Sequence, residues 1–286
     1  MRTRVASVGT PIHYVDVGRG PVLLFVHGGP AWSFTWRGLI AQLSDAFRCV
    51  ALDLPGFGSS PAPAARFGLG DYARSVQRFA ETLDLQGATV VANDTGGPIG
   101  FRAAAALPGR FRALVAIDTF AFRLDDFLSV RLMLRASSSL PARLVNRWFN
   151  VLPRAVTSFG TPLRRWQPEE RATYLSPFAA RAARDRCVDL LGALDREPDF
   201  LAELERELAP LADRPLLTVF GSDDPVRRVG FPERFAALFS DCTPRIVPGA
   251  KHFSHEDDPE LVARYLREWY AERVSVQPRR SGSGLA

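Results

Sequence analysis

The sequence predicts an α/β fold in which helices cover both faces of a mostly parallel sheet and a helical insertion interrupts the sheet. Short apolar runs alternate with amphipathic stretches along residues 11–120, and this alternation resumes at Pro215. Between them, residues 121–209 show helical patterns broken by prolines but no clear strand. The chain has 286 residues, of which 47% are hydrophobic, so it can bury one large core.

The first part of the chain predicts alternating strands and helices. Residues 11–17 alternate in polarity, whereas Val22–Val26 is apolar throughout, which is typical of a central strand buried on both faces. Further strands are expected at 49–54, 88–92 and 113–118, and helices at 36–43, 71–83 and 99–107. Turns rich in glycine or proline close these strands.

The insertion and the last part of the chain complete the predicted fold. Helices are expected in the insertion at 127–134, 142–151 and 179–194. After Pro215, strands are expected at 216–220 and 244–248, with helices at 231–239 and 259–273. We therefore expect a core of residues 1–120 and 210–276. The tail 277–286 is rich in Gly, Ser and Arg, and we expect it to be disordered.

Cysteine usage and the N-terminal sequence predict the cellular setting. Cys49, Cys187 and Cys242 are odd in number and far apart, which favours neither a disulfide framework nor a metal site. The chain shows no signal peptide and no apolar stretch long enough to span a membrane. We expect a cytoplasmic protein that has no membrane partner.

The positive charge is concentrated in the insertion. The net charge is +5 and the isoelectric point is about 9.5. Residues 127–168 contain no Asp or Glu, but they contain the arginines 131, 135, 143, 147, 154, 164 and 165. These seven positive charges exceed the net charge of the whole chain, so the rest of the chain is slightly negative. The high isoelectric point therefore does not indicate a basic surface for nucleic acid, and we expect no nucleic-acid partner. Two interpretations stay open: a solvated helix face, or one or two arginines that face a pocket and favour a substrate with a carboxylate.

Asp94 lies in a segment that predicts a nucleophile. The segment Asn93-Asp94-Thr95-Gly96 follows a buried strand and opens a helix. This is the spacing of a nucleophile elbow, in which small neighbours let one side chain protrude above the sheet. An Asp before a helix can also be a simple N-cap. The turn His27-Gly28-Gly29-Pro30 offers amides beside the elbow, and the amides of Gly29 and Thr95 could form an oxyanion hole.

Two later segments supply the other groups of a triad. Asp223 and Asp224 lie just past one strand, and His252 lies just past the last strand. Nucleophile, acid and His follow in the order that hydrolases use on α/β sheets. The chain has only four histidines, so the coincidence is informative.

These segments resemble the α/β-hydrolases that have an Asp nucleophile, and most closely the haloalkane dehalogenases. The matching stretches are residues 27–37, 53–60, 91–100, 174–178, 251–253 and 256–259. The resemblance covers roughly residues 10–275 and implies an α/β-hydrolase fold: a mostly parallel, eight-stranded sheet with a helical cap, here residues 121–209, inserted after the sixth strand.

The resemblance implies a two-step hydrolysis. Asp94 would form an ester with the substrate carbon, and His252 would activate the water that cleaves it. Asp224 would be the triad acid, because the Gly-x-x-Asp spacing matches the superfamily, with Asp118 as a reserve acid. The amides of Gly29 and Thr95 would hold the oxyanion. The chemistry is complete without a metal or organic cofactor, and the expected partner is a small-molecule substrate of a monomer or homodimer.

The leaving group is less well defined. In haloalkane dehalogenases Trp follows the nucleophile, and a second halide donor is an Asn after His-Gly or a Trp in the cap. Here these positions hold Thr95 and Gly29, which leaves Trp148 and Trp166 as candidates for substrate binding. Epoxide hydrolysis is the alternative, and it needs two cap tyrosines, of which only Tyr174 is present. A ligand-binding protein without turnover is the second alternative.

Overall fold

A computed structural model describes residues 3–275, which form one eight-stranded sheet. Its strands are β1 Thr3–Ser7, β2 Pro11–Val17, β3 Val22–Val26, β4 Arg48–Leu52, β5 Ala88–Asp94, β6 Phe111–Thr119, β7 Leu216–Gly221 and β8 Cys242–Val247. They lie in the order β1-β2-β4-β3-β5-β6-β7-β8. Only the pairs β1–β2 and β2–β4 are antiparallel. The predicted fold class is therefore confirmed.

Helices connect the strands and form the insertion. The helices of the core are α1 Arg37–Leu43, α2 Leu69–Thr82, α3 Gly96–Ala106, α10 Pro225–Arg228, α11 Phe231–Leu238, α12 Ser254–Asp257 and α13 Pro259–Trp269. Those between β6 and β7 are α4 Leu128–Ser138, α5 Leu140–Phe149, α6 Val151–Ala155, α7 Pro168–Leu175, α8 Arg181–Arg196 and α9 Pro198–Glu207. We use the name cap for the segment from α4 to α9. The division of domains at residues 121 and 209 stays a prediction.

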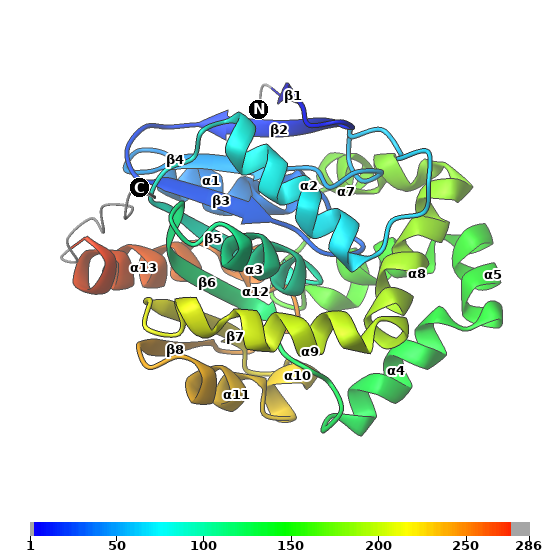
Figure 1. The fold of residues 1–286 in the computed structure, drawn as a ribbon. Helices are drawn as coiled ribbons and strands as arrows, with labels where there is room; N and C mark the ends of the chain where they lie inside the picture. The colour runs from blue at the N-terminus through cyan, green and yellow to red at the C-terminus, as the bar shows by residue number, and fades with distance from the viewer. Residues whose placement is uncertain (1–2, 276–286) are drawn as a thin grey trace.

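Successive residues of the central strands feed two apolar cores, one on each face of the sheet. In β3, Leu24 and Val26 pack into the core beneath α2 and α3, whereas Leu23 and Phe25 pack into the core beneath α1 and α13. All four side chains are fully buried. Figure 1 shows α2, α3 and α9 on one face and α13 on the other. The unbroken apolar run of β3 thus matches a strand that is covered on both sides.

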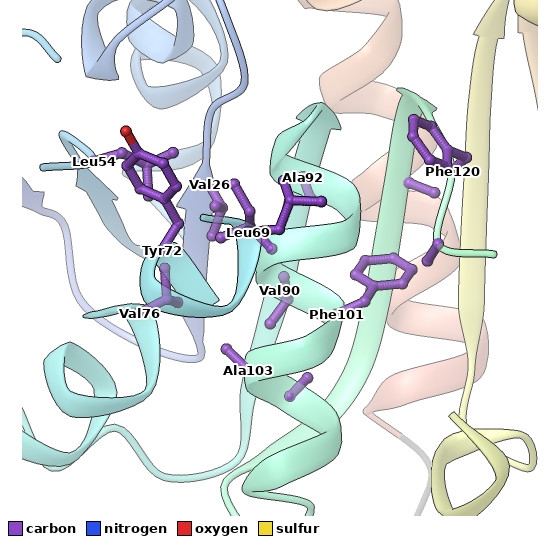
Figure 2. Packing of buried hydrophobic residues seen from close by; sticks show 14 of the residues in the cluster. Val26, Leu54, Leu69, Tyr72, Val76, Val90, Ala92, Phe101, Ala103 and Phe120 are labelled. Carbon is purple, nitrogen blue, oxygen red and sulfur yellow. The ribbon is translucent and has the colours of Figure 1, made fainter. Parts of the chain in front are cut away.

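The core beneath α2 and α3 extends to the carboxyl end of the sheet. Figure 2 shows Val26, Val90 and Ala92 from the sheet packed beside Tyr72 and Phe101 from the helices. All five are buried. This core therefore supports the strand ends at which the turns after β3 and β5 begin.

The strand order places those two turns side by side. The chain runs from β3 to β4 on one side and then returns to β5 on the other side of β3. Such a reversal opens a crevice at the carboxyl ends of the strands. Gly28 and Gly29 follow β3, and Asp94 ends β5. Both turns that were predicted to carry the site therefore lie at this crevice.

The structure extends the predicted elements at several places. The short strand β1 was not predicted, because most of its side chains are exposed and it shows no buried apolar run. In the cap, α7 and α9 were not predicted from the sequence, and both begin at a proline, which is tolerated in the first turn of a helix. The predicted tail 277–286 lies outside the described residues.

Arginines of α4 and α5 join these helices to α8 by ion pairs. Arg135 pairs with Asp195 at 2.9 Å, and Arg143 and Arg147 pair with Asp189 and Asp185. The acidic residues all belong to α8. Much of the positive charge of the cap is therefore matched inside the cap. Within residues 3–275, no helix is long and apolar enough to cross a bilayer.

We predict that Phe122→Ala lowers the free energy of unfolding by about 3–5 kcal/mol. Phe122 is fully buried, and its ring centroid lies 5.1 Å from that of Phe231 and 5.2 Å from that of Phe235. These contacts join the start of the insertion to α11. Urea denaturation followed by circular dichroism measures the change. Phe159→Ala is the control, because that ring is 72% exposed, and it should cost less than about 0.5 kcal/mol. Equal costs would contradict this packing argument.

Candidate active site

Asp94 lies on a sharp turn between β5 and α3. Its φ of +52° is in the left-handed region, which non-glycine residues adopt only rarely. A Cβ on Gly28 would lie 2.3 Å from Asp94 Oδ1, and one on Gly96 would lie 2.3 Å from the Val26 carbonyl. Only glycine fits these two positions, because the turns after β3 and β5 pack directly against each other.

Asp94, His252 and Asp224 form one line of hydrogen bonds. His252 Nε2 lies 3.0 Å from Asp94 Oδ2, and His252 Nδ1 lies 3.0 Å from Asp224 Oδ2. The Asp94 and His252 side chains are 14% and 27% exposed, whereas Asp224 is fully buried. Asp223 instead pairs with Arg228 at 2.9 Å. The structure thus brings together the three residues that the chain order singled out.

Backbone amides hold the other oxygen of Asp94. The Gly29 amide donates to Asp94 Oδ1 at 3.0 Å, and it also lies 3.0 Å from Thr95 Oγ1. The Thr95 amide and hydroxyl contact the same carboxylate. The two amides expected to form an oxyanion hole therefore converge on Asp94, which leaves Oδ2 as the oxygen beside His252.

Neighbouring charges set the protonation of the line. Burial alone would lower the pKa of His252, but the Asp224 and Asp94 carboxylates raise this pKa well above its usual value. Burial alone would raise the pKa of Asp94, but its hydrogen bond to His252 and the amide of Thr95 lower it. In the free protein Asp94 is thus held ionised and His252 is held protonated.

Asp118, the reserve acid, lies close to this line but does not bond to His252. Its carboxylate accepts from the Gly221 amide at 2.8 Å, the Ser254 amide at 2.8 Å and the Ser254 hydroxyl at 2.6 Å. Burial and the charge of Asp224 raise the pKa of Asp118 to about 8. Its contacts tie the end of β6 to the turn after β7 and to the helix that follows His252.

A small apolar cavity of about 60 Å³ adjoins Asp94 and His252. Asp118 and Thr119 also line it, and the remaining lining is apolar: Val130, Met133, Leu134, Leu191 and Leu194 of the cap and Phe120, Val226 and Phe231 of the core. A wider depression of about 640 Å³ lies between α2, α3 and α9, away from the line of hydrogen bonds.

The structure places the expected substrate-binding residues outside the cavity lining. Trp148 is 55% exposed, and the Arg181 guanidinium lies 3.7 Å from its ring centroid. Trp166 donates to Thr161 Oγ1 at 2.8 Å and packs on Tyr174. Tyr174 is fully buried, and its hydroxyl donates to the Pro30 carbonyl at 2.7 Å. Each side chain is occupied elsewhere in the fold.

The interpretation of arginines that face a pocket gains no support from the contacts of these side chains. The residues that line the cavity include no arginine. Arg135, Arg143 and Arg147 pair with α8, and Arg164 pairs with Glu170 at 2.7 Å. The pattern of alternating Arg and apolar residues in this segment reflects attachment of the cap helices, which the sequence could not distinguish from a pocket.

A buried ion cluster links the cap to the segment that carries His252. Arg37 Nη1 lies 2.6 Å from Glu256 Oε1, and Arg164 Nη1 lies 3.5 Å from Glu256 Oε2. Glu256 is 1% exposed. The Arg37 guanidinium also lies 4.9 Å from the Trp166 ring centroid. The position of Trp166 is therefore explained by packing on this cluster.

Asn93 is a further positioning residue, which the sequence motifs did not indicate. Its side-chain amide donates to the Ile117 carbonyl at 3.0 Å and to the His252 carbonyl at 3.3 Å. Its place just before the nucleophile was the only available signal. The cavity lining was also missed, although the spacing of Val130 and Leu134 on one helix face could have indicated it. The described residues contain no group of His, Cys, Asp and Glu arranged to hold a metal ion.

Comparisons with known proteins agree with this geometry. The family described as the alpha/beta hydrolase fold matches residues 21–259. Haloalkane dehalogenase 2 of Mycobacterium tuberculosis is 34% identical over 264 residues, which are 90% of each chain. The cis-3-alkyl-4-alkyloxetan-2-one decarboxylase of Shewanella oneidensis is 26% identical, over 94% of this chain and 87% of that one. The crystal structure of the haloalkane dehalogenase DbeA from Bradyrhizobium elkani superposes with a TM-score of 0.82 at 27% identity, over 95% and 98% of the two chains.

The pKa of His252 provides a test of this electrostatic arrangement. Because its folded-state pKa lies above the unfolded value of about 6.5, protonated His252 stabilises the fold below about pH 6.5. This stabilisation is lost as the pH rises through the folded-state pKa. Asp94→Asn should lower that pKa, since one of its two carboxylate partners loses its charge. Titration of the imidazole signals by NMR measures the pKa, and Asp223→Asn, which leaves the line intact, should not change it. An unchanged pKa in Asp94→Asn would refute the coupling.

Proposed function

This chain belongs to the alpha/beta hydrolase fold family and, within it, to the haloalkane dehalogenases, and we propose that it hydrolyses the carbon–halogen bond of a small apolar haloalkane through an ester on Asp94. The observation that carries this proposal is the hydrogen-bonded line of Asp94, His252 and Asp224, with the amides of Gly29 and Thr95 on the Asp94 carboxylate. The small apolar cavity favours a short hydrocarbon chain.

In the first step, Asp94 Oδ2 attacks the carbon that bears the halogen. A carbon–oxygen bond forms, and the halide leaves with the electrons of the carbon–halogen bond. Ionised Asp94 needs no base for this attack. Its other oxygen, Oδ1, already accepts from the Gly29 amide, so it can remain there as the carbonyl oxygen of the ester.

In the second step, His252 acts as the base. Formation of the ester removes the negative charge of Asp94, and with it one cause of the raised pKa of His252. His252 Nε2 can then take a proton from water while the water oxygen attacks the ester carbonyl carbon. The amides of Gly29 and Thr95 stabilise the resulting oxyanion, and Asp224 stabilises the imidazolium. Collapse of the intermediate releases the alcohol and restores the Asp94 carboxylate.

The cavity offers few hydrogen-bond donors to stabilise the departing halide. No tryptophan belongs to the residues that line it, and Thr95 is held against Asp94 and the Gly29 amide. Side-chain donors to a developing anion each contribute about 10²–10³ in rate. We therefore expect iodide and bromide, which need less stabilisation, to leave much faster than chloride.

The alternative of epoxide hydrolysis gains no support from the cap tyrosine. The Tyr174 hydroxyl donates to the Pro30 carbonyl and does not line the cavity, so it is not placed to protonate an alkoxide. The second alternative, a ligand-binding protein without turnover, predicts that no ester forms on Asp94, so trapping of the ester distinguishes it from the hydrolase.

We predict that His252→Ala accumulates the ester on Asp94 when it is incubated with 1-iodobutane, because the base of the second step is missing. Acid quench and peptide mass spectrometry should show one butyl group on the peptide that contains Asp94. The double variant Asp94→Asn/His252→Ala is the matched control and should show none. If His252→Ala carries no adduct on Asp94, the covalent mechanism is rejected.

A second prediction concerns the missing halide donor. A Cβ on Gly29 would meet only Leu190 Cδ2, at 3.4 Å, and the φ of Gly29 is not in the left-handed region, so a side chain fits with little adjustment. Gly29→Asn should raise the rate of bromide release from 1-bromobutane by about tenfold or more, because it adds an N–H donor. Gly29→Leu has a similar shape but no donor, and it should give no increase. An equal response of the two variants would contradict this explanation.

A further inference from the structure

The outer surface of the cap exposes an unusual number of large apolar side chains. We use the name cap apolar face for the exposed residues of α4 and α5 that are Leu128, Leu132, Leu140, Leu144, Val145, Trp148 and Phe149. Trp148 is 55% and Phe149 is 67% exposed. Figure 1 shows α4 and α5 at the outer margin of the molecule, beyond α8. Apolar surface of this extent indicates a site of interaction.

Helix α5 is inverted relative to an ordinary surface helix. Leu140, Leu144 and Trp148 recur at intervals of four residues, so they lie along one side of the helix, and all three are exposed. The only buried residue of α5 is Asn146, which donates to the Arg184 carbonyl at 2.9 Å. Arg143 and Arg147 pair with α8. The polar side of α5 thus faces the protein and the apolar side faces outward.

The charge around this face is positive. Residues 127–168 contain no Asp or Glu. Arg154, on the helix that follows α5, and Arg181 are exposed, and neither makes an ion pair with another residue of the described range 3–275. The Arg181 guanidinium lies over the ring of Trp148. A partner that covers this face must therefore be both apolar and anionic.

We propose that the cap apolar face docks on an anionic lipid bilayer. Trp148 and Phe149 would enter the boundary between headgroups and acyl chains, and Arg154 and Arg181 would lie near the lipid phosphates. A second copy of the chain fits less well, because a two-fold contact through this face would bring arginines against arginines. Docking at the surface needs no spanning helix, so it revises the expectation that the protein has no membrane partner.

The docking face is continuous with the cavity. Met133 lines the cavity that contains Asp94 and His252, and it is also 49% exposed beside Leu132 of the cap apolar face. An apolar molecule dissolved in the bilayer would therefore meet the wall of the cavity at Met133. The docking itself rests on the cap surface and is independent of the reaction at Asp94.

Flotation with vesicles tests the proposal. The full chain should float with phosphatidylglycerol vesicles at low salt, float less as salt increases, and remain unbound with phosphatidylcholine vesicles. The double variant Leu144→Ser/Trp148→Ser should lose at least about tenfold in affinity. Arg154→Gln and Arg181→Gln should each lose about fivefold. Val5→Ser/Ile246→Ser removes exposed apolar side chains outside the cap and should bind like the unchanged protein.

Several results would overturn the proposal. One is failure of the full chain to float with phosphatidylglycerol at low salt. Another is equal loss in the cap and control variants. A third is concentration-dependent self-association that Leu144→Ser/Trp148→Ser abolishes, without binding to vesicles. Circular dichroism verifies that each variant is folded. Asp94→Asn should float normally, so that a failure of docking and a failure of the proposed hydrolysis are distinguishable.

Discussion

The close approach of two turns is the constraint on which the candidate site depends. The turn after β3 and the turn after β5 meet where Gly28 faces Asp94 Oδ1 and Gly96 faces the Val26 carbonyl. This contact holds Asp94 in its left-handed conformation and brings the Gly29 amide to its carboxylate. Asn93 then joins the same strand end to Ile117 and to the backbone of His252. The nucleophile, the oxyanion donors and the base are thus positioned by one region of tightly packed backbone.

The fold and the site differ in how far the sequence determines them. Strand β3 could be predicted from its apolar run closed by Gly, and β2 from its alternating polarity, whereas β1 has exposed side chains and carries neither signal. Asp94, Asp224 and His252 could be predicted because Asp94 ends β5 and the other two lie within a few residues after β7 and β8. Parallel strands bring their carboxyl ends to one edge of the sheet. The order of these three residues along the chain was therefore sufficient to predict that they form one site.

The cap could not be predicted in the same way, because an amphipathic pattern does not reveal which side of a helix faces the protein. Trp148, Trp166 and Tyr174 are aromatic residues in the right segment, yet Trp148 lies on the surface and the other two pack beside the Arg37 cluster. The cavity is instead lined by aliphatic residues such as Leu134 and Leu191. Aliphatic side chains in a helix are ordinary core residues, and their spacing on one helix face does not by itself show whether they pack against the core or line a cavity.

The buried ion cluster of Arg37, Arg164 and Glu256 couples three segments of the chain energetically. Arg37 begins the first helix of the core, Arg164 belongs to the cap, and Glu256 follows His252 by four residues. Opening the cap alone would leave the Glu256 carboxylate buried without one of its two cationic partners, which is costly in an apolar surrounding. The cap and the His252 segment are therefore one cooperative unit, and local unfolding of either exposes the other.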